Sequence, residues 1–307
     1  MSVPILVTAF CRPELTIQAL TSLIALRPKS EIIVSQDGKI PGFYEIAHVN
    51  TRNALLQFAK KHPQIRLNLR DVNQGLTQHL FDVFESLFQS HSCVIFLEED
   101  MRICETGVTF LEASEQDLGI SHRTAFSTTG HPQGLNSVGY RLSYFPEQWG
   151  ISINYNTFQA FKEEYRKKQI DRSSVRRVIK QVKFGKVKGE FLTDFWTDLL
   201  RKEINSPHGW DAMLQWTLWK NLAPSRVSFE NHVIDLGGQA GAITTRENVE
   251  SALSYSKLKH SESSEVFCLN CEQQDAARRK FSSLSQLRSR TQIRTRMKAL
   301  NEMRTYR

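Results

Sequence analysis

The chain has 307 residues and a formal net charge of +8, and 40% of its residues are hydrophobic and 10% aromatic. That is enough apolar material for one large core or two smaller ones, as in an ordinary globular protein. No run of about 18 apolar residues occurs, so no membrane-spanning helix is expected. The five cysteines are odd in number and scattered, which argues against a disulfide framework. Cys268 and Cys271 form a lone CxxC pair, for which reduced structural thiols and a zinc or redox site both stay open.

Apolar runs and helical periodicity alternate over the first hundred residues. Strands are predicted at 4–10, 31–35, 65–70 and 94–97, and helices at 14–25, 51–61 and 75–89. This β-α-β-α-β-α-β series is typical of an open, mostly parallel α/β sheet, in which ligands bind beyond the carboxyl ends of the strands. Polar residues at three such ends, Arg12, Asp37 and the run 98–100, are therefore expected to converge on one crevice.

The fourth predicted strand ends in three consecutive carboxylates, Glu98, Glu99 and Asp100. Adjacent carboxylates repel one another and resist burial, so a cation is expected beside them. Oxygen ligands of this kind suit Mg²⁺ or Mn²⁺, which commonly hold nucleotide phosphates. An ordinary strand end with a solvated acidic turn is the alternative. These three residues alone do not distinguish it from a metal site.

Two regions are strongly basic. Residues 162–188 contain eleven Lys/Arg against three acids, and residues 273–307 contain ten against two, so each has a net charge of +8. We interpret residues 162–204 as a helical excursion from the sheet, with Ser173 or Ser174 as the cap of one of its helices. This excursion either covers an acceptor site or is a plain solvated insertion. The tail is interpreted as a basic amphipathic helix that either contacts anionic lipid or a partner, or packs on the body. No nucleic-acid reader motif accompanies the charge, so no nucleic-acid partner is expected.

Several short motifs resemble, in their order and spacing, the GT-A glycosyltransferases, in particular N-acetylglucosaminyltransferase I and its bacterial family 2-like relatives. The motifs are Val34-Ser35-Gln36-Asp37, Leu97-Glu98-Glu99-Asp100 and Gly209-Trp210-Asp211, with support from Cys11-Arg12-Pro13, Asn73-Gln74-Gly75-Leu76, Tyr144-Phe145-Pro146, Trp149-Gly150 and 231–238. The resemblance covers roughly residues 3–245. It implies a GT-A domain over 1–250, with a nucleotide-binding half at 1–105 and an acceptor half at 106–250, followed by a linker and basic tail at 251–307.

The resemblance also implies roles for particular residues. Arg12 and Asp37 match positions that contact the donor nucleoside, and Glu98-Glu99-Asp100 matches an acidic motif whose last residue binds the metal and whose middle residue reaches the nucleotide sugar. Asp211 matches the catalytic base that takes a proton from the acceptor hydroxyl.

The implied activity is an inverting, Mn²⁺- or Mg²⁺-dependent transfer from a nucleotide sugar to a hydroxyl of a glycan or other acceptor. A UDP-linked donor, with N-acetylglucosamine as one candidate sugar, follows from the resemblance alone. Independently of it, His232 is expected to reach the donor phosphates when a glycine-bearing loop at 231–241 closes.

Simpler interpretations of the same residues stay open. Asp37-Gly38 is also a common turn pair, Asp211 is also suited to cap a helix over 212–222, and Trp149 and Trp210 suit packing as well as sugar stacking. A sugar nucleotidyltransferase is one alternative function, although Ala9-Phe10-Cys11-Arg12 lacks the glycine-rich phosphate loop it needs. A non-catalytic nucleotide-sugar-binding module is another.

The start of the chain enters a strand without a signal-like region, so we expect a cytoplasmic protein, with peripheral contact to the inner face of the membrane through the tail as an option.

Overall fold

The structure is a computed structural model that describes residues 3–42, 44–116, 126–127, 140–143, 150–182, 189–206, 209–228 and 232–235. Within these ranges no helix is both long and apolar enough to cross a bilayer. The basic tail, the CxxC pair and the motif at 144–149 lie outside the described residues, so the predictions made for them stay predictions.

The first half of the chain alternates between strands and helices. Its elements are β1 (Ile5–Ala9), α1 (Pro13–Leu26), β2 (Ile32–Gln36), α2 (Glu45–Lys61), β3 (Ile65–Leu69), α3 (Leu76–Leu87) and β4 (Cys93–Glu98). Each predicted strand and helix is confirmed, with ends that differ by at most two residues, except that α2 begins at Glu45 rather than at residue 51. Its first turns carry exposed apolar side chains such as Ile46, which obscures the helical pattern in the sequence.

The strands form one eight-stranded sheet in the order β3-β2-β1-β4-β8-β6-β9-β7. The strands β1 to β4 are all parallel, whereas β8 (Ile151–Asn154) runs antiparallel to β4. The far side of the sheet consists of β6 (Phe126–Ser127), β9 (Ser225–Ser228) and β7 (Tyr140–Ser143). The predicted class, an α/β protein with a mostly parallel sheet, is confirmed. The carboxyl ends of β1 to β4 consequently meet at one edge.

A second, two-stranded ribbon was not predicted. It pairs β5 (Met101–Ile103) with β10 (Val233–Asp235) in antiparallel fashion, and Met101 faces Asp235 in the register. Since β5 begins directly after Asp100, the ribbon holds the downstream side of the acidic turn.

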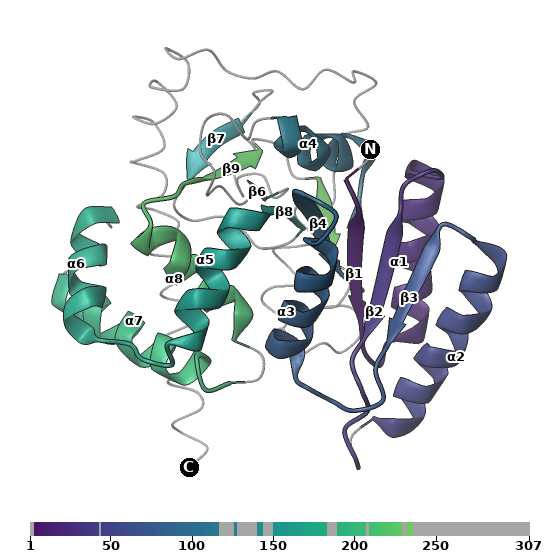
Figure 1. Ribbon diagram of the computed structural model, residues 1–307, viewed down its shortest axis with the longest axis horizontal. Helices are drawn as coiled ribbons and strands as arrows, with labels where there is room; N and C mark the ends of the chain where they lie inside the picture. The colour runs from purple at the N-terminus through teal and green to yellow at the C-terminus, as the bar shows by residue number, and fades with distance from the viewer. Residues whose placement is uncertain are drawn as a thin grey trace.

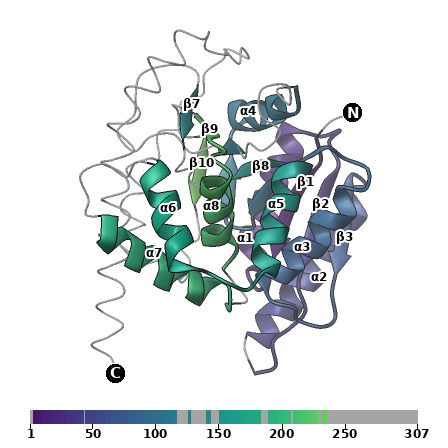
Figure 2. The ribbon, with the colours of Figure 1, turned by 60° about the vertical axis from the view of Figure 1, so that its left-hand side comes forward.

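Helices cover both faces of the large sheet (Figure 1). The remaining helices are α4 (Glu105–Gln116), α5 (Tyr155–Arg166), α6 (Arg172–Val182), α7 (Gly189–Glu203) and α8 (Trp210–Lys220). One core joins the sheet to α3, α5, α6, α7 and α8, and the other joins it to α1, α2 and α4. Figures 1 and 2 both show α6 and α7 on the side of the molecule away from β3 and α2.

The helical excursion is part of the first core. Val175, Ile179 and Val182 of α6 are buried as their spacing predicted, in the same cluster as Phe96 of β4. A plain solvated insertion is therefore the wrong interpretation of the described parts of this range, residues 162–182 and 189–204. The predicted cap is also wrong, because the carboxylate of Asp171 accepts hydrogen bonds from the backbone N–H groups of Ser173 and Ser174 (3.2 and 2.9 Å) and from both hydroxyls. A carboxylate with two oxygens can serve several N–H groups of the first turn at once.

Candidate functional site

The acidic turn and Arg12 come together at the carboxyl edge of the sheet. Glu98 is the last residue of β4, and Glu99 and Asp100 form the turn into β5. Arg12 follows β1, the neighbouring strand, and its Nη1 lies 2.5 Å from Oδ2 of Asp100 and 3.9 Å from Oε1 of Glu99. The side chains of Glu99 and Asp100 are each 13% exposed. The predicted convergence is thus confirmed for Arg12 and the acidic turn, whereas the contacts of Asp37 lie with the loop before α3.

The carboxylates of this cluster are short of positive charge. The pKa of Glu98 is raised to about 8, first by burial and then by the charges of Asp100, Glu99 and Asp211, with Arg12 acting in the opposite direction. Burial and Asp100 likewise raise the pKa of Glu99 to about 7. Near neutral pH the cluster therefore holds its full negative charge poorly, and an additional cation would relieve it.

Asp211 reaches the same cluster from a distant part of the chain. It is the second residue of α8, and its charge is among those that raise the pKa of Glu98. Its Oδ1 accepts a hydrogen bond of 2.7 Å from the backbone N–H of Ala212. A carboxylate in the first turn is favoured by the helix dipole. The capping position itself is Gly209, so the helix begins at Trp210 and not, as predicted, at residue 212.

Two neighbours of Asp211 fix its place. The ring of Trp210 packs edge to face on Phe96 of β4, and Trp210 is buried, which favours packing over sugar stacking for this residue. A side chain at Gly209 would overlap the carbonyl oxygen of Glu203 at the end of α7. The motif Gly209-Trp210-Asp211 thus packs α8 against both β4 and α7.

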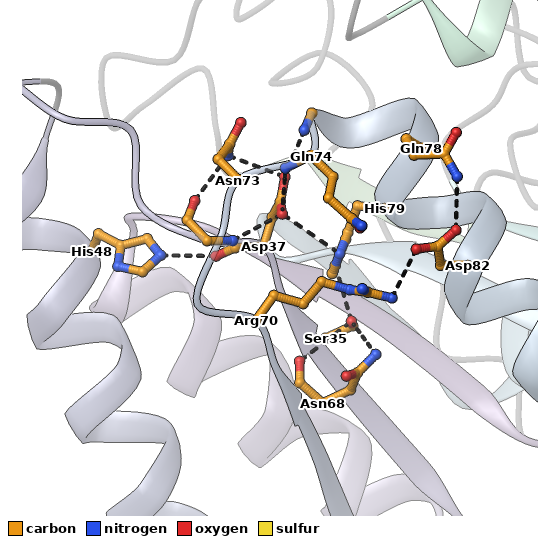
Figure 3. A network of polar contacts seen from close by, with 12 residues as sticks. Ser35, Asp37, His48, Asn68, Arg70, Asn73, Gln74, Gln78, His79 and Asp82 are labelled. Carbon is orange, nitrogen blue, oxygen red and sulfur yellow. Dashed lines mark hydrogen bonds and ion pairs between the residues drawn. The ribbon is translucent and has the colours of Figure 1, made fainter.

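Asp37 lies at the end of β2, and its carboxylate is engaged within the protein (Figure 3). Its two oxygens accept hydrogen bonds from the backbone N–H groups of Gly38 (2.8 Å), Gln74 (3.0 Å) and Gly75 (2.9 Å) and from the side-chain amide of Asn73 (3.1 Å). Asp37 is also only 5% exposed. Hydrogen bonds to this carboxylate therefore hold the loop before α3 against the end of β2. The predicted contact of Asp37 with the donor nucleoside would compete with these hydrogen bonds.

The loops after β2 and β3 pass each other closely beside Asp37. A side chain at Gly38 would overlap the backbone of Val72 and Asn73, and Lys39 forms a bridge with Val72. His79 lies behind this crossing, 1% exposed, with Nε2 2.9 Å from Oγ of Ser35.

The Nδ1 of His79 lies 3.8 Å from Oδ1 of Asp37. Figure 3 shows the two side chains turned toward each other. Burial lowers the pKa of His79 although Asp37 acts to raise it.

Sequence reasoning missed the part that Gln36 and Arg52 play in this edge of the sheet. The buried amide of Gln36 donates to the carbonyl oxygens of Phe10 (2.9 Å) and His48 (3.1 Å), so it ties the end of β1 to α2. Arg52 donates to Oε1 of Gln36 (3.1 Å) and to the carbonyl oxygen of Arg70. The available signal was a polar residue, Gln36, at the end of an otherwise apolar strand.

His232 lies apart from the acidic turn. Its backbone carbonyl accepts a hydrogen bond from the N–H of Cys104, at the end of β5 that is remote from Asp100. His232 is 7% exposed, and its ring bonds to Ser228 Oγ (2.9 Å) and Thr106 Oγ1 (3.1 Å). Burial lowers its pKa to about 4. The predicted contact with donor phosphates would require both ring contacts to break, and most of the loop at 231–241 is outside the described residues.

The residues of the acidic turn fit a metal that is only partly held by the protein. Among the described residues no three His, Cys, Asp or Glu side chains lie close enough together to hold a metal ion by themselves. Mg²⁺ usually keeps several waters and is often bound through one or two carboxylates plus substrate phosphates. Asp100, with Glu99 beside it, fits that pattern.

No family model matches the chain, and no curated protein matches it. Among the solved structures that align with it, a mannose-1-phosphate geranyltransferase from Thermus thermophilus has 11% identity and a TM-score of 0.38, and the alignment covers 74% of this chain and 73% of that chain. The galactosyltransferase LgtC in complex with donor and acceptor sugar analogues has 13% identity and a TM-score of 0.35, with 84% of this chain and 98% of that chain covered. A cytidylyltransferase from Leptospira borgpetersenii serovar Hardjo-bovis has 14% identity and a TM-score of 0.31, with 53% of this chain and 64% of that chain covered. The chain thus spans less than two thirds of the last of these. Similarity this low assigns neither a family nor an activity.

Proposed function

We propose that the chain is a metal-dependent glycosyltransferase that moves a sugar from a nucleotide-sugar donor to a hydroxyl of a glycan or other acceptor. The observation that carries this proposal is the grouping of Glu98, Glu99, Asp100 and Asp211 beside Arg12 at the carboxyl edge of the sheet. The pKa values of Glu98 and Glu99 are raised, so their negative charges are poorly compensated, and a divalent cation beneath a diphosphate would compensate them.

In this proposal Asp100 holds Mn²⁺ or Mg²⁺, and Glu98 and Glu99 lie toward the donor sugar. The bound ion would supply Lewis-acid neutralisation of the departing diphosphate. Arg12, whose guanidinium pairs with Asp100, would then turn toward the same phosphates. The resemblance supports a UDP-linked donor, with N-acetylglucosamine as the first sugar to test.

Asp211 is the proposed general base. Its position in the first turn of α8, within electrostatic reach of Glu98, supports a carboxylate that faces the same crevice from the acceptor side. The base removes the proton from the acceptor hydroxyl as that oxygen attacks the anomeric carbon, and the bond to the diphosphate breaks. A single displacement of this kind inverts the anomeric configuration.

The deciding experiment measures turnover of UDP-sugars with and without Mn²⁺ in four proteins: the wild type, Asp100→Ala, Asp211→Asn and, as a control, Asp194→Asn on the exposed side of α7. We expect Asp100→Ala to abolish metal-dependent turnover, and Asp211→Asn to lower it by about 10²–10⁴-fold while UDP binding is retained. Asp194→Asn should behave as the wild type.

Other outcomes would replace the proposal. Synthesis of a UDP-sugar from UTP and a sugar 1-phosphate would favour the nucleotidyltransferase. UDP-sugar binding without turnover under any metal would favour a binding module. Equal UDP affinity with and without metal, in the wild type and in Asp100→Ala, would show that the proposed reaction does not involve a metal ion.

A further inference from the structure

A cavity of about 790 Å³ lies at the end of β4 opposite to the acidic turn. One wall is the end of α3 and the connection to β4, residues 85–92, and the other is the start of α5, residues 154–159. With a rise of about 3.3 Å per residue along β4, the cavity and Glu98 are separated by roughly 16 Å. It is therefore distinct from the candidate active site, and its volume is within the range of small-molecule sites.

The cavity presents an aromatic surface. Tyr155 is 47% exposed, and its ring lies edge to face with Phe88, with the centroids 5.8 Å apart. Phe88 in turn stacks on the buried ring of Phe158 at 5.2 Å, so the aromatic wall continues into the core between α3 and α5, which lie side by side (Figures 1 and 2). The backbone N–H of Tyr155 donates to the carbonyl of Ser92 (3.1 Å), which fixes the residue at the cavity. An exposed aromatic ring held in this way is a stable platform.

Uncharged polar groups surround that ring. The side-chain amides of Gln89, Asn156 and Gln159 line the cavity and make no hydrogen bond with the described part of the chain. Each amide offers both donors and an acceptor. Such groups match hydroxyl groups, which also donate and accept.

The ionisable groups of the lining are already engaged. Glu85 pairs with Lys162 of α5, and Nε2 of His91 lies 3.5 Å from Oε2 of Glu31. A charged ligand would have to compete with these contacts, whereas a neutral one would not. Aromatic surface and neutral amides together are suited to a ligand with apolar C–H faces and many hydroxyls.

We propose that this cavity binds an uncharged carbohydrate, with one sugar ring stacked on Tyr155 and its hydroxyls bonded by Gln89, Asn156 and Gln159. The site is independent of the proposed transferase reaction, because binding here needs neither nucleotide nor metal. It would hold a glycan segment remote from the reacting hydroxyl, or a separate glycan.

The test is saccharide binding to the full chain without nucleotide or metal, with maltotriose, cellotriose and N,N′,N″-triacetylchitotriose as probes in calorimetry and saturation-transfer NMR. We expect at least one probe to bind saturably, Tyr155→Ala to weaken it at least tenfold, Gln159→Ala to weaken it less, and Tyr155→Phe to retain most of the affinity. Tyr44→Ala removes another exposed tyrosine and serves as the matched control. Melting temperatures of all variants verify folding.

Several results would overturn the proposal. They are no saturable binding of any of the three probes, equal binding by the wild type and Tyr155→Ala, or a loss of binding in Asp211→Asn that Tyr155→Ala does not share. The last would locate the saccharide in the catalytic crevice. Failure of turnover in the transferase assay has no bearing on any of these measurements.

Discussion

The ring of Trp210 meets the ring of Phe96 edge to face, with the centroids 5.3 Å apart and the ring planes at 84°. Phe96 lies two residues before Glu98 on β4, and Trp210 directly precedes Asp211 on α8. This contact therefore joins the strand that ends in the acidic turn to the helix that carries the proposed base.

Replacing Trp210 should disturb the position of Asp211 more than the fold. Trp210→Leu loses the ring contact, and small displacements of a catalytic group are costly, so we expect turnover to fall by about tenfold or more with the donor KM little changed. Trp210→Phe keeps an aromatic ring and should lose less. The control is Trp196→Leu, which removes a buried ring from the same core, where Trp196 packs on Trp219. Equal losses of turnover in Trp210→Leu and Trp196→Leu, at equal stability, would contradict a positioning role.

Gly209 should not tolerate a side chain. The methyl group of Gly209→Ala would overlap the carbonyl oxygen of Glu203, so either α7 or the start of α8 must shift. We expect a loss of about 1–3 kcal/mol in the free energy of unfolding, as for other overpacked sites. Gly189→Ala is the matched control, since a methyl group there meets nothing within 4 Å and alanine favours a helix. Urea unfolding measures the unfolding free energies of the two variants. Similar values would refute the close approach of Gly209 to the carbonyl oxygen of Glu203.

Asp37 should stabilise the protein in the absence of any ligand. In Asp37→Ala the N–H groups of Gln74 and Gly75 lose their acceptor, which costs about 1–3 kcal/mol for each group that stays unsatisfied. Asp71→Ala is the control, because its carboxylate is 93% exposed in a surface pair with Arg52 and should contribute less than about 1 kcal/mol. Thermal unfolding without nucleotide measures the stability of both variants. An unchanged melting temperature in Asp37→Ala, with lost donor affinity, would instead support the direct contact with the donor.

The acidic turn should make the metal-free protein less stable as the pH rises. The folded-state pKa values of Glu98 and Glu99, about 8 and 7, exceed their ordinary value of 4.5. Between pH 4.5 and these values the folded state binds more protons than the unfolded state, so these two groups lower the unfolding free energy as the pH increases. His232, whose pKa is lowered to about 4, acts in the opposite direction, since its contribution to stability is present above pH 6.5 and is lost as the pH falls toward 4.

The comparison of wild type with Glu98→Gln isolates the effect of the carboxylate, because His232 is the same in both. We expect the melting temperature of the wild type in EDTA to fall relative to Glu98→Gln between pH 5 and pH 8. Mn²⁺ should raise the melting temperature of the wild type more at pH 8 than at pH 5, since the metal binds the deprotonated carboxylates. Parallel pH profiles of the two proteins would rule out the raised pKa of Glu98.

Local sequence accounts for the first half of the fold, from β1 to β4. The alternation of strands and helices, the burial of β1, β2 and β4 and the placement of Arg12 and the acidic turn at one edge all follow from apolar periodicity. The physical reason is that each element buries its own apolar face, and consecutive parallel strands bring their carboxyl ends to the same edge. The approach of Arg12 to Asp100 then follows from the direct pairing of β1 with β4.

Only the tertiary structure decided which groups each polar side chain meets. Asp37 reads as a turn residue or a donor contact, yet its carboxylate is bonded to a loop 36 to 38 residues further along the chain. Asp211 approaches Glu98 because Trp210 packs on Phe96 and because Gly209 lets α8 begin against α7. Periodicity records which face of an element is buried, whereas the partner of a buried carboxylate depends on contacts between segments that the sequence separates widely.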